Sequence, residues 1–315
     1  MNISKSTKIK NILVTGATGF IGRNLVRQLI KQGHKVYALV RKTSDTGLLK
    51  ELGVSLIYGD ITDNESLNKV LEEKIDIIFH CAALVDDKDK NQLYRINVSG
   101  TRNICNLALR LNVERLVYVS SVAVVSGNLE PCLTEDLSYA ATNRYGQSKI
   151  EAEKIVIEFR KKGLVVAIIR PPMVYGEEEP HLLRKILSLL RLRLLPLING
   201  GNAKLHLGYV GNVVNAILLA GEKREFLEGT FFIADEDIFT LKEVFCIFAQ
   251  SCNYPKPISL PRWFTPVLTC IPCIGKKFKF LCRDRAYDIS RIKSLGYKEE
   301  FKARESLVRS ARAIK

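Results

Sequence analysis

The chain has 315 residues, enough for one large or two modest domains. Apolar residues make up 47% and charged residues 26%, as in an ordinary globular protein and unlike a disordered or low-complexity chain. A net charge of +15 suits an anionic cofactor, an acidic substrate, an anionic membrane surface or simply a lysine-rich solvated surface, but no basic motif with interleaved aromatic residues predicts nucleic-acid binding.

No segment predicts secretion or a membrane span. Residues 1–10 are polar and basic without an apolar core, and no apolar run approaches the roughly 18 residues that a spanning helix needs. The eight cysteines are scattered, which favours reduced thiols in a cytoplasmic protein. Cys270, Cys273 and Cys282 lie close in sequence, but a fourth ligand is missing, so we expect packing rather than a metal site.

The first motif is a strand, a glycine turn and a helix. Ile9, Ile12, Leu13 and Val14 give a short apolar run that predicts a buried parallel strand, and apolar side chains within residues 25–30 recur at helical spacing. Such a turn brings backbone N–H groups and a helix N-terminus to a pyrophosphate. The G-x-x-G-x-x-G spacing differs from the common G-x-G-x-x-G, so a plain tight turn is the alternative. The candidate cofactor contacts here are Gly16, Thr18, Gly19, Phe20, Ile21 and Gly22.

Strands and helices alternate through the first half of the chain. We expect strands at 35–40, 54–58, 75–80, 116–121 and 164–170, and helices at 66–71, 93–111 and 143–162. Asp63 or Asn64 is the expected cap of the first of these helices. Repeated strand–helix units predict an α/β fold of the Rossmann type, with a doubly wound parallel sheet. Ligands of such sheets bind at the carboxyl ends of the strands.

The residues after the second expected strand bear on the choice of cofactor. An NAD site usually has an acidic residue here for the ribose hydroxyls, whereas this chain has Arg41 and Lys42, and Asp45 comes several residues later. A guanidinium group suits a 2′-phosphate. We therefore expect NADP with Arg41 as a contact, and a solvated basic turn that accepts NAD is the alternative.

The next two strand ends add further candidates. Asp60 follows the third strand, where its carboxylate can accept a hydrogen bond from the adenine amino group, and a role in starting the next helix is the alternative. His80 stands beside apolar residues at the end of the fourth strand, so we expect a structural rather than a catalytic histidine. The small residues that follow let the loop lie against a cofactor. The candidate contacts at these ends are Asp60, Ile61, Cys81, Ala82 and Ala83.

The candidate catalytic residues come from the fifth strand end and the helix beyond it. Tyr145 and Lys149 are four residues apart, so they share one face of the helix. A lysine cation near a phenol lowers a pKa of about 10, and the tyrosine can then exchange a proton with a hydroxyl or a carbonyl group. Ser121 can hydrogen-bond the same oxygen, and Lys149 can also hold the nicotinamide ribose. An exposed Tyr and Lys on an amphipathic helix is the alternative.

Seven motifs occur in a fixed order: Thr15–Gly22, Gly59-Asp60, His80–Ala83, Asn97–Asn103, Val119–Ser121, Tyr145–Lys149 and Arg170–Gly176. With them, residues from about 10 to 297 resemble an extended short-chain dehydrogenase/reductase of the NAD-dependent epimerase/dehydratase superfamily. The resemblance implies catalytic roles for Ser121, Tyr145 and Lys149. It also implies that Asn97 supports the active-site helix and that residues 171–174, among them Pro171 and Val174, line the nicotinamide.

Departures from the epimerase pattern bear on the branch of this superfamily. Sugar-nucleotide epimerases usually have an asparagine where this chain has Met173. The Arg-Pro-Pro sequence at 170–172 is similar to the dihydroflavonol reductase and 3β-hydroxysteroid dehydrogenase branches, as are residues 39–41, 285–290 and 295–297. The usual aspartate after the seventh-strand motif is replaced by Gly211. Ser120 is the alternative to Ser121, because the loop to Gly127 is one residue longer than in sugar epimerases.

The expected NAD(P)-binding domain comprises residues 1–172 with a returning segment at about 205–235. Residues 173–204 and 236–315 are expected to form a smaller substrate-binding domain. The basic, leucine-rich stretch His181–Ile198 is expected to be helical, with packing on the sheet domain favoured over a lid or a membrane contact. Trp263–Ile274 is apolar and followed by lysines, so contact with a membrane interface is an alternative to packing there. The resemblance also implies a homodimer through the helices at 93–111 and 143–162.

These features predict an NAD(P)-dependent enzyme that interconverts a secondary alcohol and a ketone on an apolar, ring-bearing small molecule by hydride transfer. One alternative is a nucleotide-sugar epimerase or dehydratase that keeps its NAD; the high positive charge favours it and Met173 argues against it. A cofactor-binding regulatory or scaffold protein is another alternative. A binding module has no need of a tuned phenol, so the Ser121, Tyr145 and Lys149 set argues against it.

Overall fold

The computed structural model describes residues 8–85, 88–180, 182–226, 229–260 and 283–314. The expected interfacial segment Trp263–Ile274 and the three neighbouring cysteines therefore lie outside the described residues. Within the described part of the chain, no helix is both long and apolar enough to cross a bilayer, and no cluster of side chains is arranged to hold a metal ion.

The chain forms two compact units. The first comprises Met1–Gly127, Ser138–Arg170 and Val214–Phe231, and the second comprises Asn128–Leu137, Pro171–Val213 and Phe232–Lys315. The segment 128–137, which the sequence assigns to the cofactor domain, groups with the second unit because Leu133 N–H donates to Ala286 O at 2.9 Å. Glu135 of the same segment accepts from the Phe232 N–H at 2.8 Å. The returning segment is also shorter than expected.

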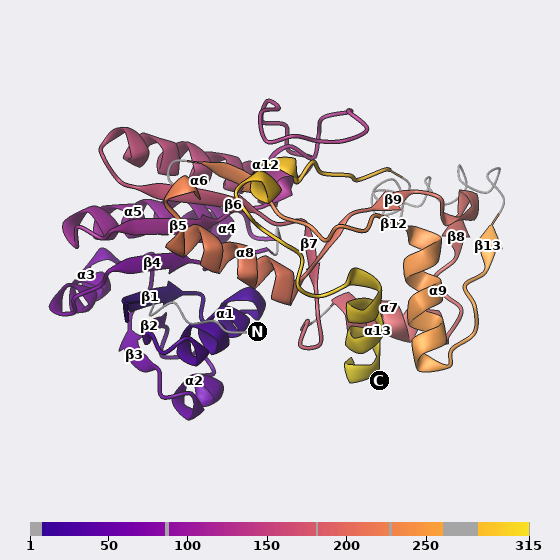
Figure 1. Ribbon diagram of the computed structural model, residues 1–315, viewed down its shortest axis with the longest axis horizontal. Coiled ribbons are helices and arrows are strands. Elements are labelled where there is room, and N and C mark those ends of the chain that lie inside the picture. The colour runs from indigo at the N-terminus through magenta and orange to yellow at the C-terminus, as the bar shows by residue number, and fades with distance from the viewer. Residues whose placement is uncertain (1–7, 86–87, 181, 227–228, 261–282, 315) are drawn as a thin grey trace. The chain divides into compact units, whose positions relative to one another are not determined.

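The first unit is built on a seven-stranded sheet in the order β11-β6-β5-β4-β1-β2-β3 (Figure 1). The strands are β1 (Asn11–Thr15), β2 (Lys35–Val40), β3 (Ser55–Tyr58), β4 (Ile77–His80), β5 (Arg115–Val119), β6 (Val166–Arg170) and β11 (Thr230–Phe232). Strands β1 to β6 pair in parallel. This arrangement confirms the Rossmann-type fold, because the strand order reverses direction at β1 and β4.

Helices cover both faces of this sheet. They are α1 (Phe20–Lys31), α2 (Gly47–Glu51), α3 (Asn64–Leu67), α4 (Lys90–Tyr94), α5 (Gly100–Arg110), α6 (Arg144–Lys161) and α8 (Val210–Glu222). Helices α5 and α6 lie side by side and bury Ile104, Val156 and Phe159 in one core with alternate residues of the strands. On the other face, α8 approaches so closely that a Cβ at Gly221 would lie 2.5 Å from the Phe79 ring. The sheet is therefore doubly wound.

Two predicted helices differ from the expected ones. The stretch expected at 93–111 is divided into α4, a π-helical turn at Arg95–Ser99 and α5. The π-helical turn contains Asn97, whose side-chain amide forms two hydrogen bonds with the backbone of Leu84. The helix expected at 66–71 begins earlier, as α3, and continues as a 3-10 helix over Asn68–Glu72. Its cap is Asp63, which accepts from the Glu65 N–H at 3.0 Å.

The second unit combines short strands with three packed helices. Its elements are β7 (Met173–Tyr175), α7 (Leu182–Arg191), β8 (Leu197–Ile198), β9 (Lys204–Leu205), β10 (Leu207–Tyr209), β12 (Phe239–Thr240), α9 (Leu241–Cys252), β13 (Ser259–Leu260), α12 (Ser290–Ser294) and α13 (Ala303–Ile314). Helices α7, α9 and α13 pack against one another. The buried stripe of α7 is Leu183, Leu187 and Leu190, so the expected helix is present but ends before Ile198.

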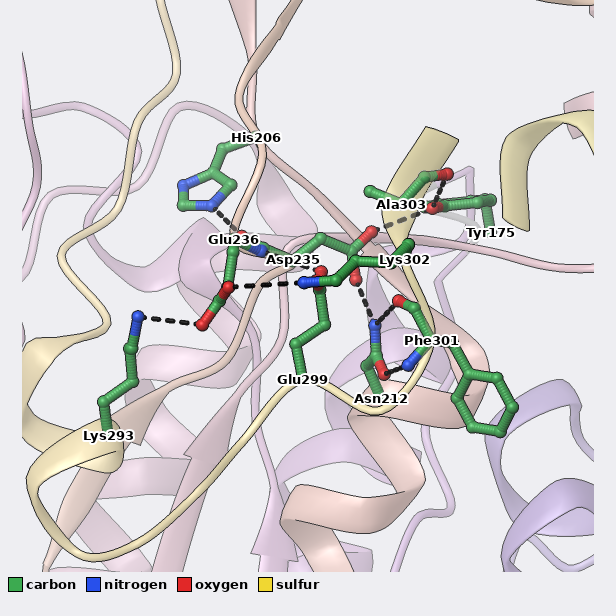
Figure 2. A network of polar contacts seen from close by, with 10 residues as sticks. All are labelled: Tyr175, His206, Asn212, Asp235, Glu236, Lys293, Glu299, Phe301, Lys302 and Ala303. Atoms are coloured by element: carbon green, nitrogen blue, oxygen red, sulfur yellow. Dashed lines mark hydrogen bonds and ion pairs between the residues drawn. The ribbon is translucent and has the colours of Figure 1, made fainter. Parts of the chain in front are cut away.

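A buried carboxylate organises this unit. Asp235 accepts from the Tyr209 N–H at 2.9 Å. It also accepts from Asn212 Nδ2 at 2.8 Å and from the Tyr175 hydroxyl at 2.9 Å (Figure 2). The Tyr175 hydroxyl has a second acceptor, Ala303 O at 3.1 Å. Asn212 also exchanges two hydrogen bonds with the backbone of Phe301. Residues distant in sequence are thus joined through one side chain.

Burial raises the pKa of Asp235 to about 6, against the opposite effect of the hydrogen bonds that it accepts from Asn212, Tyr209 and Tyr175. Because the folded state binds this proton more tightly than the unfolded chain does, the stability that the group contributes is fully present below about pH 4 and is lost as the pH rises through 6. A pKa shift of this size corresponds to a change of about 3 kcal/mol in the free energy of unfolding.

We expect Asp235→Asn to remove this pH dependence and still fold, because the Tyr175 hydroxyl can donate to Ala303 O and accept from the new amide. Urea unfolding of both proteins from pH 4 to pH 7 measures the effect. From pH 4 to pH 7, the free energy of unfolding of the variant should rise by about 3 kcal/mol relative to that of the wild type. A difference that stays constant with pH contradicts the assignment.

Candidate active site

The glycine turn after β1 is held by close backbone packing. Gly16 has φ +69°, and a Cβ there would lie 2.6 Å from the Ala82 backbone nitrogen. A Cβ at Gly22 would lie 2.0 Å from the Gly16 carbonyl oxygen. Both positions therefore require glycine, one for its conformation and one for the approach of α1 to the turn.

The N-terminus of α1 is open to an anion. Its N-cap residue is Gly19, which has no side chain to accept from the N–H groups of the first turn, and that turn contains no acidic residue. The first N–H groups of a helix lack intrahelical acceptors and carry the positive end of its dipole. The turn therefore fits a pyrophosphate, as the sequence predicts.

A cavity of about 290 Å³ opens at the carboxyl ends of β1 to β4. Its lining contains these predicted cofactor residues: Gly16, Thr18, Gly19, Arg41, Asp60, Ile61, Cys81, Ala82 and Ala83. Also in the lining, but not predicted, are Leu39, Val40, Ser44, Gly59, Leu84, Gln92, Arg95 and Ile96. The lining does not include Phe20, Ile21, Gly22, Asn97, Lys149, Pro171 or Val174.

The unpredicted residues divide into two kinds. Leu39, Val40 and Gly59 adjoin predicted residues at the carboxyl ends of strands, where ligands of such sheets bind, so the same reasoning could have found them. Gln92 and Arg95 come from the segment after β4, where nothing in the sequence marks them. They join the cavity because the start of α5, just beyond them, packs on the residues that follow β3. A Cβ at Gly100 would lie 2.7 Å from the Ile61 side chain.

The charges of the cavity suit a dinucleotide. Arg41 and Arg95 are exposed, and in the described part of the chain neither guanidinium forms an ion pair. The Arg41 N–H donates to Ser44 Oγ at 3.2 Å, which shapes the turn after β2. The Asp60 carboxylate accepts from the Thr62 N–H at 2.8 Å. Two unpaired cations, one carboxylate and a helix N-terminus fit the phosphates and the adenosine of NAD or NADP.

His80 is structural, as expected. It is fully buried, and burial lowers its pKa to about 3. Thr101 Oγ1 donates to Asn97 O at 2.6 Å, so it accepts from His80 Nε2 at 3.1 Å. His80 Nδ1 then accepts from Thr15 Oγ1 at 2.6 Å. A neutral imidazole thus joins Thr15 at the end of β1 to Thr101 on α5.

Asn97 links the loop after β4 to α6. Its Oδ1 accepts from the Leu84 N–H at 2.8 Å, and its Nδ2 donates to Leu84 O and to Ser148 Oγ, both at 2.9 Å. Ser148 Oγ donates in turn to Tyr145 O at 2.7 Å. The side chain therefore contacts the helix that carries Tyr145 and Lys149.

Ser121 and Tyr145 are brought together by the end of β5 and the start of α6. The Ser121 hydroxyl accepts from the Ala123 N–H at 3.1 Å, where it caps a short 3-10 helix at Val122–Val124. It also hydrogen-bonds Tyr145, which favours the phenolate, but burial has the larger effect and raises the pKa of Tyr145 to about 12. The phenol is therefore protonated at neutral pH.

Lys149 is fully buried on α6. Its Nζ donates to Val119 O at 2.8 Å and lies 4.3 Å from the centre of the Tyr118 ring. Burial lowers its pKa to about 7, against the opposing charges of Glu153 and Cys81. Lys149 was expected to lower the pKa of Tyr145, but the structure shows the opposite direction for the phenol. The ammonium is directed at a backbone carbonyl, and desolvation dominates.

Ser120 has a different environment from Ser121. Its hydroxyl is buried and donates to Glu153, whose carboxylate also accepts from Arg170 Nε at 2.9 Å and Nη2 at 2.7 Å. The Tyr139 hydroxyl donates to the same carboxylate at 2.8 Å. Ser120 is thus committed to a buried ion pair, whereas Ser121 contacts the candidate proton donor.

The remaining candidates belong to the second unit. Pro171 is buried, and Val174 and Met173 lie on β7, with Met173 38% exposed. Gly211, where the resemblance leads one to expect aspartate, has no room for a side chain: a Cβ there would lie 2.6 Å from the Tyr209 ring and 2.9 Å from the Phe301 ring.

Comparison with known proteins agrees with this geometry. Residues 12–234 match the model of the NAD dependent epimerase/dehydratase family. A 3-beta-hydroxysteroid dehydrogenase from Mycolicibacterium neoaurum is 31% identical over 69% of the chain, which spans 62% of that relative's length. A UDP-glucose 4-epimerase from Vibrio cholerae is 33% identical over 97% of the chain and 95% of its own.

The fold is also that of a solved UDP-glucose 4-epimerase from Thermotoga maritima, with a TM-score of 0.80 at 21% identity over 96% of this chain and 98% of the other. The family match covers more than half of the residues and includes the strand–glycine–helix motif and the Tyr145–Lys149 helix. The chain therefore belongs to the NAD dependent epimerase/dehydratase family, within the extended short-chain dehydrogenases/reductases.

Proposed function

We propose that this chain is an NADP-preferring oxidoreductase that interconverts a ketone and a secondary alcohol on an apolar, ring-bearing substrate. One observation carries the proposal: the Tyr145 phenol hydrogen-bonds Ser121, and the buried Lys149 stands one helical turn further along α6. Ser121 follows β5, and the cavity residue Cys81 follows β4, which pairs with β5 in parallel. The proton-transfer groups and the cavity therefore share one sheet edge.

When bound, the reduced nicotinamide supplies the hydride that adds to the substrate carbonyl carbon. Tyr145 gives its phenolic proton to the carbonyl oxygen as the C=O π electrons move there, and the resulting phenolate regains a proton from solvent. Ser121 orients that oxygen through a hydrogen bond. With its pKa raised to about 12, the Tyr145 phenol keeps its proton at neutral pH, as the proton donor of this step must.

Two observations support the class of substrate and cofactor. Met173 presents a partly exposed apolar side chain where sugar-nucleotide epimerases usually have an asparagine, and the Mycolicibacterium relative is named for a hydroxysteroid. Arg41 lines the cavity and forms no ion pair within the described residues, so its guanidinium is available to a 2′-phosphate.

A nucleotide-sugar epimerase is the second candidate, because the Vibrio cholerae epimerase matches over nearly the whole chain. The two candidates differ in whether the cofactor leaves. Mass spectrometry of the small molecules released on denaturing the purified protein separates them. Near-stoichiometric NAD supports the epimerase, whereas an empty protein that binds NADPH more tightly than NADH supports the reductase.

Tyr145→Phe should keep cofactor affinity and lose at least about a hundredfold in turnover, since it removes the proton that general acid catalysis supplies. Turnover is followed by NADPH oxidation with a panel of cyclic ketones that includes 3-ketosteroids, and affinity by NADPH fluorescence. Tyr58→Phe, at a 40% exposed tyrosine of the same unit, is the matched control. Near-full activity of the Tyr145 variant refutes the role.

Replacing Ser121 and replacing Ser120 should have different effects in the same assay. Ser121→Ala should lower turnover by about tenfold or more, because it removes the hydroxyl that orients the reacting oxygen. The Ala123 N–H that this hydroxyl caps is only partly buried and can bond water instead, so the melting temperature should stay within about 2 °C. Ser120→Ala should instead lower the melting temperature, because it removes a donor from the buried Glu153 carboxylate. The reverse pattern assigns the catalytic hydroxyl to Ser120.

Arg41→Gln should weaken NADPH binding by roughly ten- to a hundredfold, the scale of a charged hydrogen bond, and leave NADH binding unchanged. Lys42→Gln, at the adjacent exposed cation, is the control and should change neither affinity strongly. Equal losses for both cofactors would show that Arg41 contacts a part that NADH and NADPH share, and the preference for NADP would then have no support.

A further inference from the structure

The C-terminal end of α7 carries a surface that is both apolar and basic. We name it the α7 tip, and it comprises Arg191, Leu192, Arg193, Leu194, Lys256 and Ile258. Leu192 and Leu194 are each 63% exposed, and Ile258 is 47% exposed. Arg191, Arg193 and Lys256 are exposed as well. Exposed apolar side chains that gather beside cations are typical of interaction surfaces rather than of an ordinary solvated face.

The leucines of the tip do not belong to the core stripe of α7. That stripe is Leu183, Leu187 and Leu190, which are buried where α7 packs with α9 and α13 in the second unit. The apolar contribution of α7 to the core of its unit is thus complete without Leu192 and Leu194, so the need to fill the core does not explain them.

The backbone holds the tip in a defined conformation. Leu192 N–H donates to Ser188 O at 3.2 Å, and Leu194 N–H donates to Leu189 O at 2.9 Å. Between them Arg193 has φ +56°, a left-handed conformation that usually belongs to glycine or asparagine at a helix end. A cation therefore occupies a position where glycine is less strained, between two exposed leucines.

The neighbouring segment adds to the same surface. Strand β8 pairs in parallel with β13, and Leu197 N–H donates to Ile258 O at 2.7 Å. This pairing places Ile258, and Lys256 two residues before it, beside the chain that leaves α7. The backbone thus brings together exposed apolar and basic residues from two distant parts of the sequence.

Both segments lack acidic residues. The sequence has no aspartate or glutamate from Pro180 to Gly221 or from Val244 to Arg283. The flanking carboxylates serve as helix caps: Glu179 accepts from the Leu183 N–H at 2.7 Å, and Glu243 completes the capping box of α9 with Thr240. The charge of the tip is therefore of a single sign.

We propose that the α7 tip docks on an anionic lipid bilayer. Leu192, Leu194 and Ile258 enter the headgroup region, and the cations beside them contact lipid phosphates. A symmetric contact between two copies of the tip is disfavoured, because the cations of one copy would face and repel those of the other. The inference does not depend on the proposed reductase activity, although a protein on a bilayer is well placed to meet an apolar substrate.

The test uses the full chain and vesicles of phosphatidylcholine with or without phosphatidylglycerol. The wild type should co-sediment with the anionic vesicles and not with the neutral ones. Arg191→Gln with Arg193→Gly should lower the partition coefficient at least about tenfold, given the effect of each basic residue near a charged surface. Glycine suits the left-handed backbone at position 193, so this variant should fold. Leu192→Ser with Leu194→Ser should also weaken binding.

Matched controls change similar residues elsewhere. Lys31→Gln with Lys50→Gln removes two exposed cations of the first unit, and Leu129→Ser changes a leucine that is 85% exposed. Both should bind like the wild type. The proposal is overturned if the wild type ignores anionic vesicles, if the tip variants bind as well as it does, or if the controls lose as much. A dimer that the leucine changes convert to a monomer would also overturn it, by assigning the tip to self-association.

Discussion

The buried ion pair between Glu153 and Arg170 fixes the geometry on which the candidate active site depends. Arg170 ends β6 and Glu153 lies on α6, one turn after Lys149 and two turns after Tyr145. The carboxylate accepts two hydrogen bonds from the guanidinium and one each from Ser120 and Tyr139. A charge that is so fully hydrogen-bonded can remain buried without a large penalty, and its partners set the rotation of α6 relative to the strand ends.

A second polar contact holds the same helix from the other direction. Asn97 in the π-helical turn donates to Ser148. The helix that carries Tyr145 is therefore held both through the strand ends and through the segment that lines the dinucleotide cavity. The Glu153 charge also acts on Lys149, where it opposes the fall of the pKa that burial causes. The same ion pair thus fixes the position of α6 and favours the protonated form of Lys149.

The sequence predicts most of the frame because the frame follows from local patterns. Apolar runs mark the strands, with β2 at its expected residues, and the glycine turn is recognisable from spacing alone. What could not be predicted depends on contacts between distant residues. Arg95 enters the cavity because the start of α5, just beyond it, packs on Ile61, which follows β3. The raised pKa of Tyr145 likewise depends on burial, whereas the sequence shows only that a lysine lies four residues away.

The close packing of Gly16 and Gly22 has a consequence for how an unliganded form of this protein is obtained. The space for a side chain is already filled by backbone atoms at both glycines: those of Ala82 at Gly16, and those of Gly16 at Gly22. Any larger residue would disturb the junction of β1 and α1 before it disturbed a phosphate. Poor binding after such a change would therefore report a damaged fold. A side chain that only projects into the cavity, such as Arg95, offers a cleaner way to empty it while the scaffold stays intact.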